Sequence, residues 1–175
     1  MDVDRSPGLT GDRVSLRPVE LDDAPSLAAI LAEPAVARWW SGFDEERVIQ
    51  ELVDDDPAER HYVIETEGRV IGFIQSFEEM DPDFRHASID LFLASDLHGQ
   101  GLGPDAIRVL ARHLIEERGH HRLTIDPAAG NQAAIAAYGK VGFRAVGLMR
   151  QYQRMSDGRW VDGLLMELLA SEFAT

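Results

Sequence analysis

The amino-acid sequence predicts one α/β (α+β) domain, built on a mixed central β-sheet that is flanked by helices. Apolar residues alternate with polar ones through the middle of the chain, and from residue 104 to 118 their spacing becomes helical. The chain has 175 residues, of which 45% are apolar and 27% charged, as expected for one ordinary core. We expect residues 1–12 to form a loose lead-in and residues 13–175 to form the domain.

The first third of the chain is expected to contain one strand and two helices. Residues 13–17 alternate polar and apolar side chains, and a proline follows them, which suits the end of a strand. A helix is predicted from Asp22 or Asp23, either of which can cap it, to the residue before Pro34. Its apolar side consists of Leu27, Ile30 and Leu31. A second, shorter helical pattern covers residues 44–53.

The middle of the chain is rich in strand patterns. Residues 61–66 and 70–77 flank a short connection that contains glycine, which predicts a hairpin. Another strand is expected at residues 87–94. One face of this strand carries Ile89, Leu91 and Leu93. The other face carries Asp90 and Phe92. The acidic stretch 78–85 between these strands is expected to be an exposed loop.

The last part of the chain alternates helices and strands. A helix is predicted at 104–118, a strand at 122–125 and an alanine-rich helix at 131–140. Two final strands, 143–155 and 160–169, are joined by Ser-Asp-Gly-Arg, which is a hairpin signal. The predicted order of elements is therefore β-α-α-β-β-β-α-β-α-β-β.

Composition and charge exclude several classes of function. The net charge of −14 argues against nucleic-acid binding, which needs a basic surface, and is compatible with a cationic substrate. An acidic surface that only aids solubility is the alternative explanation. The chain has no cysteine for disulfides or thiolate metal sites. Its six histidines show no metal-ligand spacing, so no metal is expected, and His120 and His121 are expected on the surface.

A membrane location is not expected either. No apolar run approaches the roughly 20 residues that a membrane helix needs. The first seven residues carry charges and no apolar run, so they are not predicted to be a signal peptide. We therefore expect a cytoplasmic protein without a membrane partner.

The most informative motif is His98-Gly99-Gln100-Gly101-Leu102-Gly103, between a predicted strand and a predicted helix. Its glycines allow a tight turn, and the amides at the start of the next helix can bind an anion such as a pyrophosphate. A purely structural turn is the alternative. The motif lacks the Lys-Ser or Lys-Thr of a P-loop, and its place after several strands disfavours a dinucleotide-binding fold.

Two motifs of this chain resemble those of the GNAT acetyltransferase superfamily. Residues 98–103 are similar to its pyrophosphate loop, Gln/Arg-x-x-Gly-x-Gly/Ala, except that His98 takes the first position. Residues 126–143 resemble its Asn-x-x-Ala-x-x-x-Tyr-x-x-x-Gly-Phe segment. Both motifs occur in the family's order and on the expected elements, so the resemblance covers nearly the whole chain.

The resemblance implies acetyl-CoA (coenzyme A with a thioester-linked acetyl group) as co-substrate. In this family the strand before the loop pairs with the pantetheine arm, and the loop amides hold the pyrophosphate. The residues that the resemblance places at the coenzyme are Leu91, Phe92, Leu93, His98, Gly99, Gln100, Gly101, Leu102, Gly103, Asn131, Ala134 and Tyr138.

Several segments look in particular like the aminoglycoside 6′-N-acetyltransferases, among them Trp39-Trp40, Ile89-Asp90 and Asp126-Pro127. This implies acetylation of a primary amine of a cationic small molecule, specifically an aminoglycoside 6′-amino group, and hence antibiotic resistance. Protein N-terminal and siderophore-lysine acyltransferases share some of these features, and a non-catalytic acyl-CoA sensor would share the fold. A homodimer is also considered.

Transfer of an acetyl group from a thioester to an amine requires a base, stabilisation of an oxyanion and an acid for the leaving thiolate. The resemblance implies Tyr138 as the acid, Asp90 as the amine contact and base, and Asp126 at the strand end where both substrates meet. Each has a structural alternative. Tyr138 would be a partly buried tyrosine with a satisfied hydroxyl, Asp90 a solvent-facing strand residue, and Asp126 an Asx-turn cap.

Four other residues are expected at the amine-binding site: Trp40, Gln75, Glu78 and Glu79. Adjacent tryptophans at a helix end are more often packing residues. A run of acidic residues is usually a solvated face, which is the alternative for both glutamates.

Overall fold

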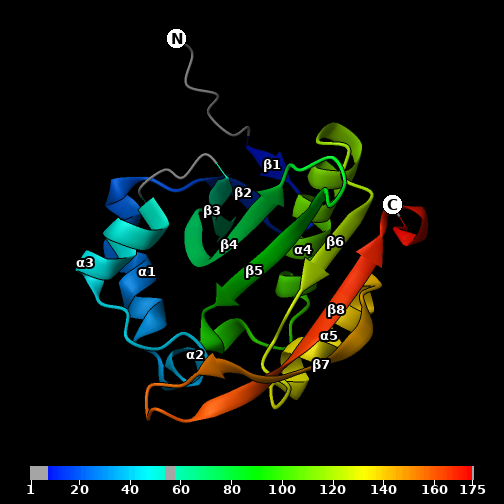
Figure 1. Cartoon of the computed structure of the whole chain (residues 1–175). Coiled ribbons are helices and arrows are strands. Elements are labelled where there is room, and N and C mark those ends of the chain that lie inside the picture. The colour runs from blue at the N-terminus through cyan, green and yellow to red at the C-terminus, as the bar shows by residue number, and fades with distance from the viewer. Residues whose placement is uncertain (1–7, 54–57, 175) are drawn as a thin grey trace.

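A twisted eight-stranded sheet forms the centre of the computed structural model, which describes residues 8–53 and 58–174 (Figure 1). The strands lie in the order β1-β2-β3-β4-β5-β6-β8-β7. Neighbouring strands are antiparallel except for β5 and β6, which are parallel. The mixed sheet predicted from the sequence is therefore confirmed.

The predicted strands and helices are all present, with small shifts at their ends. The strands are β1 (Leu9–Thr10), β2 (Ser15–Pro18), β3 (Glu59–Thr66), β4 (Arg69–Glu79), β5 (His86–Leu93), β6 (Arg122–Ile125), β7 (Arg144–Arg154) and β8 (Trp160–Leu169). The helices are α1 (Ala24–Leu31), α2 (Pro34–Ala37), α3 (Glu45–Val48), α4 (Leu102–Arg112) and α5 (Gln132–Val141). Both α3 and α4 continue into a π-helical turn, at Ile49–Val53 and His113–Glu117.

Two short elements were missed, because two to four residues are too few to show a period. The helix α2 begins at Pro34, where the first helix was expected to have ended. The strand β1 pairs with β2 inside the segment that was expected to be a loose lead-in. Residues 1–7 of that lead-in lie outside the described residues.

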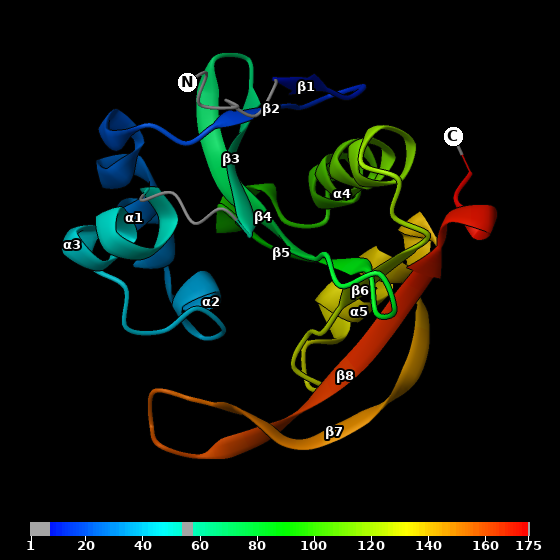
Figure 2. The same ribbon diagram turned by 45° about the horizontal axis from the view of Figure 1, so that its top comes forward.

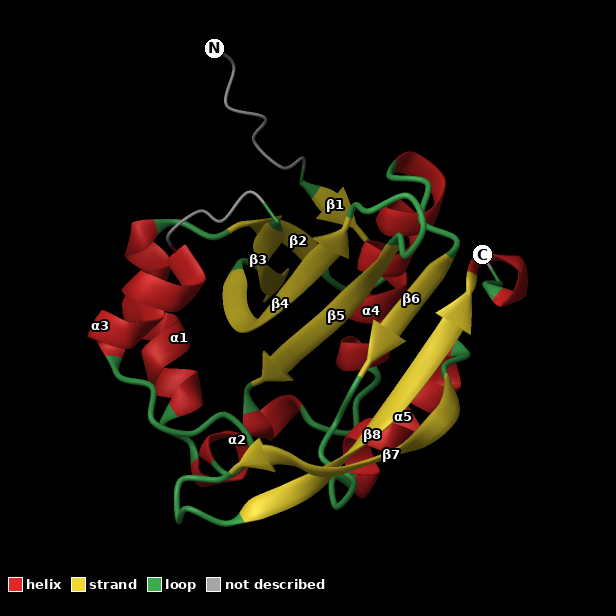
Figure 3. Cartoon of the chain, viewed as in Figure 1, coloured by secondary structure: helices red, strands yellow, loops and turns green. Residues whose placement is uncertain are grey.

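The helices cover both faces of the sheet and enclose two apolar cores (Figures 1 and 3). The larger core lies under α4 and α5, and the smaller one under α1 and α3. The strand β5 contributes side chains to both cores, because Ile89 belongs to the larger core and Phe92 to the smaller one. This confirms the alternation predicted for this strand, with Asp90 on the face of Phe92.

The acidic stretch was only partly predicted correctly, because β4 runs on through Glu79 and buries Glu78. Glu78 is 6% exposed, and its Oε2 accepts hydrogen bonds from His120 Nε2 at 2.7 Å and Arg118 Nε at 3.1 Å. Burial opposes ionisation, yet these two hydrogen bonds hold the pKa of Glu78 below its ordinary value. His120, expected on the surface, is 1% exposed. Glu78 is therefore part of a buried ionic cluster.

Neither a membrane span nor a metal site emerges from the part of the chain that the structure describes. No helix within residues 8–53 and 58–174 is long and apolar enough to cross a membrane. In the same ranges, no group of three or more histidine or acidic side chains is arranged to hold a metal ion.

Candidate active site

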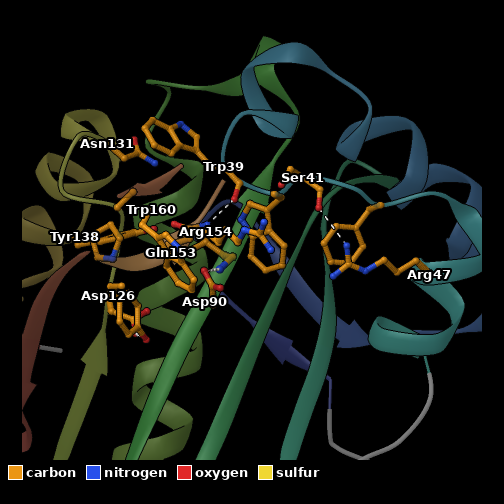
Figure 4. A pocket seen from close by; sticks show the side chains of 16 residues that line it. Trp39, Ser41, Arg47, Asp90, Asp126, Asn131, Tyr138, Gln153, Arg154 and Trp160 are labelled. Atoms are coloured by element: carbon orange, nitrogen blue, oxygen red, sulfur yellow. Dashed lines mark hydrogen bonds between the residues drawn. The ribbon is translucent and has the colours of Figure 1, made fainter. Parts of the chain in front are cut away.

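The strands β5 and β6 separate part-way along the sheet and open a cavity of about 600 Å³. Their parallel pairing is confined to Ala87 with Leu123 and Ser88 with Thr124. Beyond these pairs, Asp90 in β5 and Asp126 just after β6 line the cavity (Figure 4). Its walls include Trp39, Trp40, Leu91, Asn131, Tyr138, Tyr152, Arg154 and Trp160.

Asp90 has an unusual electrostatic environment. Its side chain is open to solvent through the cavity, while the surrounding protein displaces bulk water on the other sides. Burial, followed by the negative charge of Asp126, raises the pKa of Asp90 to about 7. The amide of Leu91, which donates to Asp90 Oδ1 at 2.9 Å, opposes this shift only in part. A carboxyl group with this pKa can exchange a proton at neutral pH.

Tyr138 extends from α5 into the same cavity and is 8% exposed. Burial, followed by the negative charges of Asp90 and Asp126, raises the pKa of Tyr138 well above its ordinary value. Its hydroxyl therefore keeps its proton at neutral pH and is available as a donor.

The hairpin of β7 and β8 supplies Tyr152, a residue that sequence reasoning missed. Its hydroxyl donates a hydrogen bond to Asp126 Oδ2. This hydrogen bond, then burial and the negative charges of Asp126 and Asp90, raises the pKa of Tyr152 to about 12. No signal in the sequence connects the two residues, which lie on different elements. The Asx-turn alternative for Asp126 finds no support among the hydrogen bonds of residues 8–53 and 58–174.

The glycine turn at residues 98–103 leads into α4 as predicted. Gly99 and Gly101 have φ angles of 77° and 83°, in the left-handed region that glycine adopts without strain. Gly101 is the N-cap of α4, so the amides of Leu102 and Gly103 lie in the first helical turn and have no partner within the helix. These amides fit the requirement for an anion site.

The polar side chains of the glycine turn are engaged with backbone. His98 Nε2 donates to the carbonyl of Leu93 at 2.9 Å, and Gln100 Nε2 donates to the carbonyl of Asp96 at 3.0 Å. An anion at this turn would therefore meet the backbone amides before either side chain.

Some of the remaining residues expected at the coenzyme line the cavity, whereas Phe92 is buried in a core. Leu91 and Asn131 line the cavity, and Asn131 Oδ1 also caps α5 by accepting from the amide of Ala134 at 3.2 Å. The ring of Phe92 is buried in the smaller core, 5.1 Å from the ring of Trp40. The side chain of Phe92, which is 5% exposed, is therefore not available to a ligand.

The structure gathers only part of the expected amine site. Trp40 lines the cavity and also packs on the core. Gln75 lies opposite Asp90 in the β4–β5 ladder but does not line the cavity. Glu78 and Glu79 pair with residues three and four positions before Asp90, nearer the other end of β5, and do not line it either.

Comparison with known proteins agrees with this fold. The family model for the acetyltransferase (GNAT) domain matches residues 13–144. The spermidine N(1)-acetyltransferase of Escherichia coli (strain K12) is 26% identical over 79% of this chain and 77% of that protein. The ribosomal protein bS18-alanine N-acetyltransferase of the same strain is 41% identical over 42% of this chain and 48% of that protein.

Among solved structures, Mycobacterium smegmatis RimJ in complex with CoA-disulfide superimposes with a TM-score of 0.85. It is 25% identical, and the match covers 97% of this chain and 90% of that one. The chain therefore belongs to the GNAT acetyltransferase family. It is an acetyl-CoA-dependent N-acetyltransferase.

The coenzyme site can be tested at the glycine turn. Acetyl-CoA should raise the Tm of the wild type, because a ligand at 100 Kd that binds only the native state adds about 2.7 kcal/mol of stability. Gly101→Val should abolish this rise, because a β-branched residue strains the left-handed turn and fills the ligand's approach. Thermal denaturation with and without acetyl-CoA measures both.

A matched control exists in the β3–β4 turn. Gly68 has a φ of 76° and no atom within 4 Å of an added Cβ, so Gly68→Val introduces similar strain away from the glycine turn. That variant should lose stability and keep the full acetyl-CoA shift. Loss of the shift in both variants would show that strain, and not the anion site, explains the result.

Proposed function

We propose that the chain acetylates a primary amine of a cationic small molecule, with aminoglycoside 6′-amines and polyamines as the two acceptor types to test first. The observation that carries this proposal is the pair Asp90 and Asp126 in one cavity, with a pKa of about 7 for Asp90. Two carboxylates can bind an ammonium ion, and a base with this pKa can remove its proton at neutral pH. Trp160, which is 56% exposed, offers an aromatic face for a second cationic group, whereas Arg38 already covers one face of Trp39.

In this proposal each polar residue of the cavity has its own task. The Asp126 carboxylate holds the ammonium group, and Asp90 accepts the proton that the amine must lose before it can attack. Acetyl-CoA supplies an acyl group that is activated as a thioester. Tyr138 keeps its hydroxyl proton at neutral pH and donates it to the sulfur that leaves.

A coenzyme A-release assay over a panel of amines tests the proposal. The panel contains aminoglycosides, spermidine, an alanine-terminated peptide and lysine derivatives. Because the chain carries a net charge of −14, kcat/KM for a polycation should fall as salt rises. Acetylation of the peptide alone would overturn the small-cation proposal. If no amine of the panel leads to coenzyme A release, a non-catalytic acyl-CoA sensor is favoured instead.

One observation favours a peptide amine as a second candidate. Arg154 lines the cavity, and within residues 8–53 and 58–174 its guanidinium has no hydrogen bond or ion pair. A free guanidinium repels a polycation but can donate to the carbonyl groups of a peptide. Arg47, the other guanidinium there, is held by the carbonyls of Ser41 and Gly42.

Arg154→Gln should separate the two candidates. For a small polycation, loss of this repulsion should raise kcat/KM about two- to fivefold, the size expected for one solvent-exposed charge pair. For a peptide acceptor, kcat/KM should fall because a donor is lost. Steady-state kinetics with spermidine, an aminoglycoside and the peptide decide this, and Arg159→Gln on the exposed hairpin turn serves as the control.

A further inference from the structure

The strand β7 contains an irregularity next to the cavity. Its pairing with β8 is interrupted after Met149 with Gly163 and resumes at Gln153 with Val161. Residues 150–152 therefore lie opposite Asp162 alone. At the centre of this bulge Gln151 has a φ of 51°, which is rare for a residue with a Cβ and costs conformational free energy.

Contacts on both sides hold the bulge in place. The amide of Gln151 donates to Asp162 Oδ1 at 2.8 Å. Gln153 Nε2 donates to the carbonyl of Trp39 at 3.1 Å, which ties the hairpin to the segment after α2 (Figures 2 and 4). A strained conformation that is held this firmly indicates that the surrounding structure uses it.

The bulge seats the Tyr152 ring directly on Gly163 of β8. A Cβ added to Gly163 would lie 2.7 Å from Tyr152 Cδ1, so only glycine leaves room for the ring. From this seat the Tyr152 hydroxyl reaches Asp126 Oδ2. No other group in the described residues donates a hydrogen bond to the Asp126 side chain.

We propose that Tyr152 is a positioning residue, which holds Asp126 as a carboxylate beside Asp90 so that Asp90 takes the amine proton. This inference rests on the proposed transfer of an acetyl group to an amine. A donated hydrogen bond stabilises the charged form of a carboxyl group. Asp90, whose pKa is raised by burial and by the Asp126 charge, is then the group that exchanges a proton near neutral pH.

The groups around Asp90 and Asp126 determine in which direction the titration of Asp90 should move when the Tyr152 hydroxyl is removed. Besides Tyr152 they are Tyr138 on α5, Arg154 on β7 and Arg47 on α3. The Tyr152 hydroxyl donates to Asp126 and so partly offsets the negative charge that raises the pKa of Asp90. Without this hydroxyl more of the Asp126 charge acts on Asp90, so Asp90 loses its proton at a higher pH.

Tyr152→Phe tests the proposal, because it keeps the ring on Gly163 and removes only the hydroxyl. The acid limb of the kcat/KM–pH profile should move up by about one pH unit, so kcat/KM at pH 7 should fall about fivefold as less of Asp90 is deprotonated. Gly163→Ala, which displaces the ring, should move the limb in the same direction. Leu148→Ala, 57% exposed on the same strand, is the control and should leave the profile unchanged.

A double-mutant cycle shows whether Tyr152 acts through Asp126. In an Asp126→Asn background, Tyr152→Phe should cause no further loss of kcat/KM. An equal loss in both backgrounds would overturn the positioning role, since Tyr152 would then act directly on the substrate.

A readout that needs no substrate separates this inference from the proposed function. Carbon-13 NMR of the aspartate carboxyl groups in the free protein should show the Asp90 titration near pH 7 in the wild type and at higher pH in Tyr152→Phe. An unchanged titration would overturn the inference. If no amine is acetylated but the titration moves, the proposed function fails and the effect of Tyr152 on the pair stands.

Discussion

Asp90→Asn should lower kcat/KM for the amine about 10²- to 10⁴-fold, the range for loss of a general base, and leave acetyl-CoA affinity unchanged. In the wild type, activity should rise with pH through about 7, because the base must be deprotonated and the pKa of Asp90 lies near that value. Asparagine cannot accept the proton, so the activity of the variant should not show this rise with pH. Steady-state kinetics from pH 5 to 9 measure both effects.

The same substitution should stabilise the protein at high pH. The pKa of the Asp90 carboxyl rises from 3.8 to about 7 on folding, so its contribution to stability is fully present below pH 3.8 and lost as pH rises through 7. Asparagine does not ionise and avoids this loss. The Tm of Asp90→Asn relative to the wild type should therefore be higher at pH 8 than at pH 4.

Two acidic residues outside the cavity serve as controls for Asp90. Asp83 is exposed, and Asp83→Asn should change neither activity nor stability. Glu78→Gln breaks the buried cluster with His120, so it should lower stability, and folded protein should keep its activity. A loss of activity in Asp83→Asn as large as that in Asp90→Asn would mean that overall charge, and not a positioned base, drives the reaction.

Tyr138→Phe should lower kcat about a hundredfold, the lower end of the range for loss of a general acid. Phenylalanine keeps the packing of the buried ring, so coenzyme binding should be nearly unchanged. Single-turnover kinetics with saturating acetyl-CoA measure the chemical step, and the acetyl-CoA shift in Tm measures binding. An unaltered rate would remove Tyr138 from the mechanism and leave water or the substrate as the acid.

Tyr138 differs from Tyr152 in a way that the two substitutions should reveal. Tyr138 is buried, whereas Tyr152 is 48% exposed and donates to Asp126. Tyr138→Phe should therefore lower the rate at every pH, and Tyr152→Phe should mainly move the acid limb. A reversed pattern would exchange the two proposed roles.

Features that depend only on residues close together in the chain could be predicted from the sequence. Alternation along β5 placed Asp90 on the face opposite Ile89 and Leu91, because successive side chains of a strand point to opposite sides. The glycine turn before α4 was equally clear, since left-handed backbone is a local demand that glycine meets. The family motifs are visible for the same reason, because each lies within one short segment.

Contacts between residues far apart in the chain could not be predicted in this way. Glu78 belongs to an acidic run that is typical of a solvated loop, yet the fold pairs it with His120, 42 positions away. Tyr152 reaches Asp126 only because a bulge in β7 interrupts the strand's register, and Gly163 leaves room for its ring. Local periodicity encodes the side of an element that a residue faces. The neighbour it meets there depends on strand order, register and bulges, which long-range packing sets.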